Sequence, residues 1–121
     1  MIGYTTIGTN NLEAALNFYD ALFGDLGGRR VMEVPNGQLY GFAQGPLFGV
    51  LKPHDGNEAF AGNGNMIALN AGTKEKAAAL HARVLEMGGS DEGAPGARSD
   101  GFYGAYCRDL DGNKLCFFVM G

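Results

Sequence analysis

The sequence predicts an α+β fold of two βαβββ modules, with a strongly curved, mostly antiparallel sheet and two helices outside it. Three observations support this prediction. The order strand, helix and three strands occurs twice along the 121 residues. A glycine pair, Gly27-Gly28 or Gly88-Gly89, follows each helical segment. Each half is too short for a core of its own, so we expect both to pack together as one domain over residues 1–121.

The first module is expected at about residues 1–53 and begins with a short β-branched strand at 2–8. Asn10 is the predicted helix N-cap because Glu13 follows at capping-box spacing. The apolar residues behind it recur at helical spacing: Leu12, Ala15, Leu16, Tyr19, Leu22, Phe23 and Leu26. Three strands are predicted at 30–34, 38–43 and 47–53, separated by Pro-, Asn- and Gly-containing turns.

The second module is expected at about residues 65–121, after a polar, glycine-rich linker at 54–64. A strand at 65–70 precedes a helix capped by Thr73, whose apolar stripe is Ala77, Leu80, Val84 and Met87. A short strand at 90–93 and a loop through Pro95 and Gly96 follow. The last strands, 102–108 and 114–120, are joined by Asp109-Leu110-Asp111-Gly112-Asn113, in which Asp-Gly is a strong hairpin signal.

Composition excludes several classes of protein. The net charge is −4 without any run of Lys or Arg, which argues against nucleic-acid binding. No apolar stretch approaches the roughly 20 residues of a membrane helix, and no signal peptide is apparent. Cys107 and Cys116 lack zinc-site spacing, and a disulfide between them is not expected. A cytoplasmic, reduced protein is therefore expected.

Three segments together resemble the vicinal-oxygen-chelate superfamily of glyoxalases, bleomycin resistance proteins and dioxygenases. YTTIGTNNLEAALNFYDALFGDLG is similar to the first strand and helix of that family, and NMIALNAGTKEKAAALHARVLEMGG to the start of its second module. YCRDLDGNKLCFF resembles its final hairpin, which usually reads Asp-Pro-Asp-Gly-Asn followed by an apolar residue and Glu. The resemblance covers about the whole chain and implies a curved open barrel. It also implies a homodimer, since many members form one.

The resemblance further implies where a divalent metal would be held. Metal-using members place His or Gln near the start of the first strand and of the second module, and Glu in the last strand. Tyr4, Met66 and Cys116 stand at these positions here. The strand at 47–53, where a further carboxylate can lie, contains only Lys52. A phenol, a thioether and a thiol suit a hard cation poorly, so we expect no metal and no other cofactor.

Tyr4, Met66 and Cys116 are expected to face the same cavity, because alternation along a strand fixes the face. Two interpretations stay open. These side chains line a pocket for a mostly apolar ligand, or they fill the former metal cavity as core. For Cys116, a buried inert thiol is favoured over a nucleophile, because the sequence shows no cation or His beside it.

Other candidate ligand-binding residues have equally ordinary alternatives. Phe48, Phe102 and Tyr106 are candidates for stacking on a planar ligand, and core packing explains them as well. His54 lies at a strand end, where binding groups are common, yet loop histidines are usually solvated. His81 is expected half-buried on the surface of the second helix. Asp109, Asp111 and Asn113 are interpreted as turn formers rather than calcium ligands.

Three functions are compatible with these residues. The preferred one is a metal-free module that binds a small, apolar or aromatic molecule. The alternative is a glyoxalase-like metal-dependent lyase, isomerase or dioxygenase that uses non-standard ligands such as His54 or a partner chain's residue. The third is a diverged domain whose surface or dimer interface is the functional part.

Overall fold

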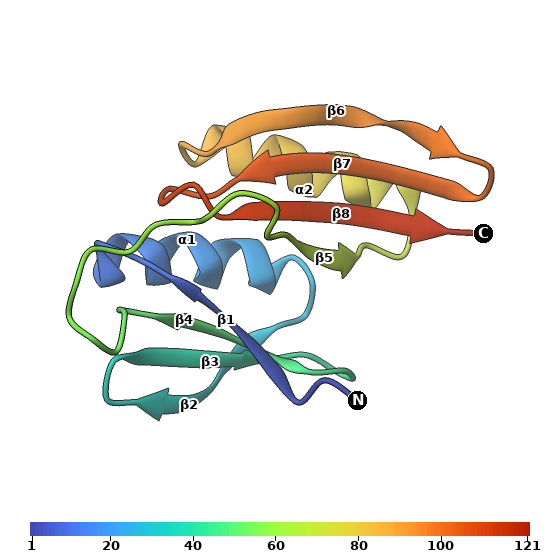
Figure 1. Cartoon of the computed structure of the whole chain (residues 1–121). Helices are drawn as coiled ribbons and strands as arrows, with labels where there is room; N and C mark the ends of the chain where they lie inside the picture. Colours follow the sequence, from blue (N-terminus) through green and yellow to red (C-terminus); the bar gives the residue numbers. More distant parts are fainter. The chain divides into compact units, whose positions relative to one another are not determined.

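The computed structural model describes residues 1–121 and separates them into two compact units, Met1–Ala61 and Gly62–Gly121. The boundary lies inside the glycine-rich stretch that the sequence marks as a linker. Each unit contains one helix and a four-stranded mixed sheet in the order strand, helix, three strands (Figure 1). The predicted α+β class and the two βαβββ modules are thus confirmed. The eight strands form two separate four-stranded sheets instead of one continuous sheet.

The first unit contains β1 (Tyr4–Gly8), α1 (Leu12–Gly24), β2 (Arg29–Val34), β3 (Gly37–Gly41) and β4 (Leu47–Leu51). Its sheet has the order β1-β4-β3-β2, with β1 and β4 parallel and the other pairs antiparallel. One face of the sheet packs against α1, and the core between them is largely aromatic: Phe18, Tyr19, Phe23, Tyr40 and Phe48.

The N-cap of α1 is Asn11, so the prediction of Asn10 was wrong by one residue. The Asn11 side chain accepts a hydrogen bond from the backbone N–H of Ala14. Asn10 has another role: its side chain donates to the carbonyl of Ala59 and accepts from the N–H of Ala59. Two adjacent asparagines offer the same capping chemistry, and only the long-range contact with Ala59 separates their roles.

The second unit contains β5 (Ile67–Asn70), α2 (Lys74–Glu86), β6 (Ser90–Ser99), β7 (Phe102–Arg108) and β8 (Lys114–Met120). Its sheet has the order β5-β8-β7-β6, and β5 and β8 are the parallel pair. Thr73 caps α2 as predicted, by accepting from the N–H of Lys76. Asp109 closes the hairpin by accepting from the N–H groups of Asp111 and Asn113, which confirms these residues as turn formers.

The largest error of the sequence interpretation concerns β6. The short strand at 90–93 and the loop through Pro95 and Gly96 are in fact one ten-residue strand. Its pairing with β7 shifts between Asp91 and Gly93 and again between Gly93 and Gly96. β6 is an edge strand, where proline costs no interior ladder bond and glycines accommodate bulges.

Neither α1 nor α2 has the length and apolar character that a membrane-spanning helix needs.

Candidate ligand-binding surface

The sheet of the second unit has two chemically distinct faces. Lys74 at the start of α2 lies 5.8 Å from the ring centroid of Tyr103, which places Tyr103 on the helix side. Alternation then puts the fully buried Ala105 and Cys107 on that side as well. The opposite face carries every second residue of β7 and β8. We call it the far face and define it as Phe102, Gly104, Tyr106, Arg108, Lys114, Cys116, Phe118 and Met120.

Tyr106 and Cys116 face each other across β7 and β8 at the centre of the far face. Burial raises the pKa of Cys116, and this effect outweighs that of the Tyr106 hydroxyl, which lowers it. Burial and the neighbouring sulfur likewise raise the pKa of Tyr106. Both groups are therefore protonated at neutral pH, and Cys116 is a buried thiol instead of a nucleophile.

An aromatic pair continues the far face beyond Tyr106. The rings of Phe102 and Phe118 stack with centroids 5.6 Å apart and planes 6° apart. Gly104 makes this arrangement possible, because a Cβ there would lie 2.9 Å from Cε1 of Phe102 and 3.4 Å from the hydroxyl of Tyr106. All three rings are half-buried. Met66 directly precedes β5 and is 45% exposed, close in sequence to Ala68, which pairs with Cys116.

His54 lies in the first unit, on a groove of about 390 Å³. The groove is lined by the ends of β1 and β4 and by the loop that follows β4. The two hydrogen bonds between Asn10 and Ala59 hold this loop, and a Cβ at Gly8 would lie only 3.1 Å from the Cβ of Ala59. His54 and the 88% exposed Phe60 therefore project from a loop that is fixed before a ligand arrives.

Tyr4 and Phe48 belong to the same unit as His54 and lie in different environments. Tyr4 is 63% exposed at the start of β1. Phe48 is 2% exposed and packs against Tyr19 and Phe23 beneath α1, with ring centroids 5.4 and 4.8 Å away. Phe48 is thus a core residue on the helix side of its sheet. The structure brings Cys116, Phe102 and Tyr106 together on one face, whereas a common cavity for Tyr4, Met66 and Cys116 stays a prediction.

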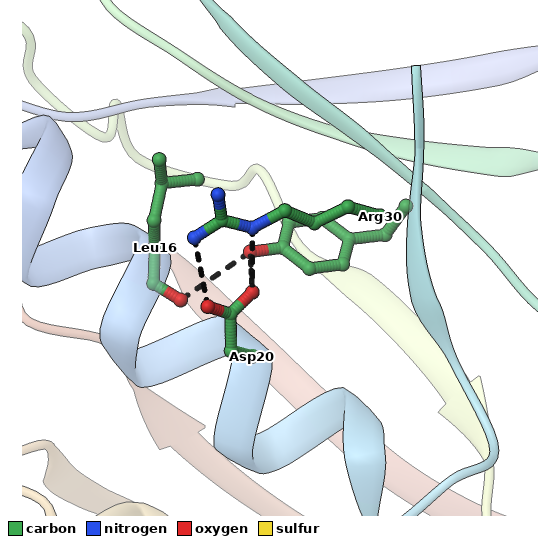
Figure 2. A network of polar contacts seen from close by, with 4 residues as sticks. Leu16, Asp20 and Arg30 are labelled. Carbon is green, nitrogen blue, oxygen red and sulfur yellow. Dashed lines mark hydrogen bonds and ion pairs between the residues drawn. The ribbon is translucent and has the colours of Figure 1, made fainter. Parts of the chain in front are cut away.

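The polar network of the first unit is structural (Figure 2). Arg30 on β2 binds both carboxylate oxygens of Asp20 on α1, with N–O distances of 2.9 and 2.7 Å. The Tyr40 hydroxyl donates to the same carboxylate at 2.7 Å and lies 3.3 Å from the carbonyl of Leu16. The hydrogen bond from Arg30 holds the pKa of Asp20 below its ordinary value, and burial raises that of Tyr40. The network ties α1 to two strands.

His81 is buried, so the expectation of a half-buried surface residue was wrong. Only 5% of it is exposed, and its Nε2 lies 2.9 Å from a carboxylate oxygen of Asp91 on β6. The N–H of Gly93 and His81 together lower the pKa of Asp91. The sequence offered no sign of this pairing, because the two residues lie on different elements. His81 therefore fastens α2 to the edge strand.

Comparison with known proteins identifies the family. The family model for the glyoxalase/bleomycin resistance protein/dioxygenase superfamily matches residues 1–117. The chain belongs to this superfamily. It is similar to the crystal structure of a glyoxalase/bleomycin resistance protein from Albidiferax ferrireducens, at 37% identity and a TM-score of 0.87 over 98% of this chain and 97% of that chain.

More distant members of the superfamily share the fold. A glyoxalase-related enzyme from Fulvimarina pelagi is 23% identical with a TM-score of 0.78, over 98% of this chain and 86% of that chain. A family enzyme from Burkholderia phytofirmans is 18% identical with a TM-score of 0.81, over 98% of both chains. No curated protein sequence matches the chain significantly.

The side chains at the superfamily's metal-binding positions do not fit a hard divalent cation. Tyr4 offers a phenol and Met66 a thioether, and burial raises the pKa of the Cys116 thiol. A thiol must lose its proton to bind a metal, which this environment opposes. No three His, Cys, Asp or Glu side chains gather in either unit in a way that could hold a metal ion. We therefore derive no chemical step through a metal.

Proposed function

We propose that this superfamily member binds a small, largely apolar or aromatic molecule without a divalent metal. The observation that carries the proposal is the far face of the second unit. The rings of Phe102, Tyr106 and Phe118 are half-buried there, and the protonated thiol of Cys116, which pairs with Tyr106 across the strands, is fully buried. Aromatic walls with few polar groups are typical of small-molecule sites.

The chemistry of the far face supports binding over catalysis by its own side chains. The raised pKa values of Cys116 and Tyr106 keep both groups protonated, so neither is an activated nucleophile or general base at neutral pH. What remains accessible is a hydroxyl and apolar aromatic surface, because Cys116 is fully buried. This combination favours retention of a ligand over its conversion.

The groove beside His54 is the second region that we propose to contact ligand. Its volume of about 390 Å³ is within the range of small-molecule sites. Its loop is held by Asn10, so little conformational entropy is lost on binding. We further propose a cytoplasmic homodimer, as in many superfamily members. Light scattering coupled to size-exclusion chromatography tests the dimer.

Thermal unfolding against a panel of aromatic and apolar compounds tests the proposed function. A ligand at about 100 times its Kd stabilises the folded protein by about 2.7 kcal/mol, a shift of several degrees in Tm. Tyr106→Ala should weaken binding, whereas Tyr103→Ala, on the helix side of the same strand, should not. Absence of any shift across the panel would count against binding. Stoichiometric metal in untagged protein would favour metal-dependent chemistry.

A further inference from the structure

The far face carries positive charge that the proposed apolar function does not use. The guanidinium carbon of Arg98 lies 5.3 Å from the ring centroid of Tyr106, and the ammonium of Lys114 lies 5.6 Å from the same centroid. Both distances are within the range of cation–π contacts. The phenol beside Cys116 is thus flanked by two cations, in a chain whose net charge is −4.

Glycines on β6 set the position of Arg98. A Cβ at Gly93 would lie 3.3 Å from one terminal nitrogen of Arg98, and a Cβ at Gly96 would lie 3.0 Å from the other. The guanidinium therefore lies along the strand surface, where it donates to the carbonyl of Ala94. A guanidinium has five N–H donors, so most of them stay available to a ligand.

Neither cation is paired with a carboxylate. Arg108 is the third cation on this part of the sheet, and its Nε lies 2.6 Å from Oε1 of Glu92. Arg98 and Lys114 have no such partner, although Arg98 is exposed and Lys114 half-buried. An accessible cation held on an aromatic ring is a ready partner for an anion.

Charged side chains near the two cysteines act in opposite directions on the pKa values of the two thiols. On the helix side, Cys107 experiences the negative charges of Asp109 and Asp91, which add to burial in raising its pKa. On the far face, Arg98 and Lys114 act in the opposite direction on Cys116, although burial still dominates there. These directions agree with the positions of Arg98 and Lys114 beside the Tyr106 ring.

We propose that the ligand of the far face carries an oxyanion, a carboxylate in the first instance, which Arg98 and Lys114 bind while its apolar part lies on Tyr106, Phe102 and Phe118. This inference rests on the proposed function and specifies its ligand class as an aromatic or apolar acid. A carboxylate beside the Tyr106 ring is attracted by both cations, because each lies within a Debye length of about 8 Å. The guanidinium fork suits a carboxylate, and it suits a phosphate equally well.

Titration calorimetry with naphthoate and naphthamide tests the inference, because these probes match in shape and differ in charge. Naphthoate should bind the whole protein about tenfold more tightly, since hydrogen bonds to charged groups are the stronger ones. The preference should decrease with added salt. Naphthyl phosphate is the third probe. If it binds more tightly than naphthoate, the oxyanion is a phosphate and the carboxylate assignment is overturned.

Substitutions test which residues produce the preference for naphthoate over naphthamide. Arg98→Met and Lys114→Met should each reduce the preference for naphthoate and leave naphthamide binding within about twofold. Lys74→Met, which removes a cation on the helix side of the same sheet, should retain it. Gly96→Ala should weaken naphthoate binding while Arg98 is intact, because the new Cβ displaces the guanidinium.

Equal affinity for naphthoate and naphthamide overturns the oxyanion inference and leaves apolar binding intact. A preference that survives both the Arg98→Met and Lys114→Met variants overturns it as well. Failure to bind either probe also refutes it, whereas the broader function fails only when the whole compound panel gives no thermal shift.

Discussion

The network of Asp20, Arg30 and Tyr40 offers the sharpest test of what stabilises the first unit. Tyr40 is 1% exposed, and its hydroxyl donates to a charged oxygen of Asp20 at 2.7 Å. Tyr40→Phe removes this hydroxyl and creates no large cavity. Asp20→Asn keeps the size of the side chain and removes the charge that both partners bind.

The expected magnitudes follow from the exposure of each group. A hydrogen bond to a charged partner contributes about 1.5–3 kcal/mol, and we take the lower end because Asp20 is 43% exposed. Tyr40→Phe should therefore cost about 1.5 kcal/mol. Asp20→Asn should cost about 2 kcal/mol, since it also weakens the ion pair with Arg30, which is itself partly screened. The double variant should cost about 1 kcal/mol less than the sum, because the two residues share one bond.

The pH dependence provides a second, independent measurement. The pKa of Asp20 in the folded protein lies below its ordinary value of 3.8. The ionised carboxylate therefore stabilises the fold above that value, and this contribution is lost as the pH falls through the folded pKa. The stability difference between wild type and Asp20→Asn should be constant from neutral pH to about pH 4 and shrink below it.

Urea unfolding followed by circular dichroism, at low and high salt, measures all four members of this cycle. High salt should reduce the cost of Asp20→Asn and leave that of Tyr40→Phe nearly unchanged. Costs of Tyr40→Phe and Asp20→Asn that add within about 0.3 kcal/mol would refute the shared-bond interpretation. A stability difference between wild type and Asp20→Asn that does not shrink below about pH 4 would refute it as well.

Three further outcomes are expected. Gly104→Ala should destabilise the second unit by about 1–3 kcal/mol, measured by urea unfolding, because its Cβ meets the ring of Phe102 at 2.9 Å. Cys107, whose pKa burial raises to about 12, and Cys116 should both resist iodoacetamide at neutral pH until urea is added; rapid labelling of either contradicts its burial. Thr73→Ala should cost about 1 kcal/mol through loss of the α2 N-cap, and Thr73→Ser should restore most of it.

Local patterns identified most of the elements. The bounds predicted for the last two strands, Phe102–Arg108 and Lys114–Met120, are those of the structure, because alternating apolar residues flank a strong Asp-Gly turn. β6 was shortened because its glycines and Pro95 were interpreted as a loop. Whether such residues interrupt a strand or occupy bulges at a sheet edge depends on the neighbouring strand, which local sequence does not reveal.

The candidate site was predictable only in part. Residue type and position indicate Tyr106 and Cys116, and the structure adds that they are cross-strand partners on β7 and β8. Arg98 and Lys114 were not selected, because nothing near either residue marks it as part of a site. Arg98 reaches Tyr106 only through the bulged pairing of β6 with β7. Polar partners on different elements, such as His81 and Asp91, could not be paired from the sequence for the same reason.

Any charge on the residue at position 116 interacts with the charges of Arg98 and Lys114. A carboxylate in place of Cys116 would lie in the field of Arg98 and Lys114 and neutralise much of it, leaving a surface with little attraction for an anion. The neutral thiol adds no negative charge beside Tyr106, whose ring centroid lies 5.3 Å from Arg98 and 5.6 Å from Lys114. An uncharged residue at position 116, which offers no ligand for a hard metal ion, thus leaves the positive charges of Arg98 and Lys114 beside Tyr106. A scaffold with that arrangement attracts the oxygens of a ligand directly.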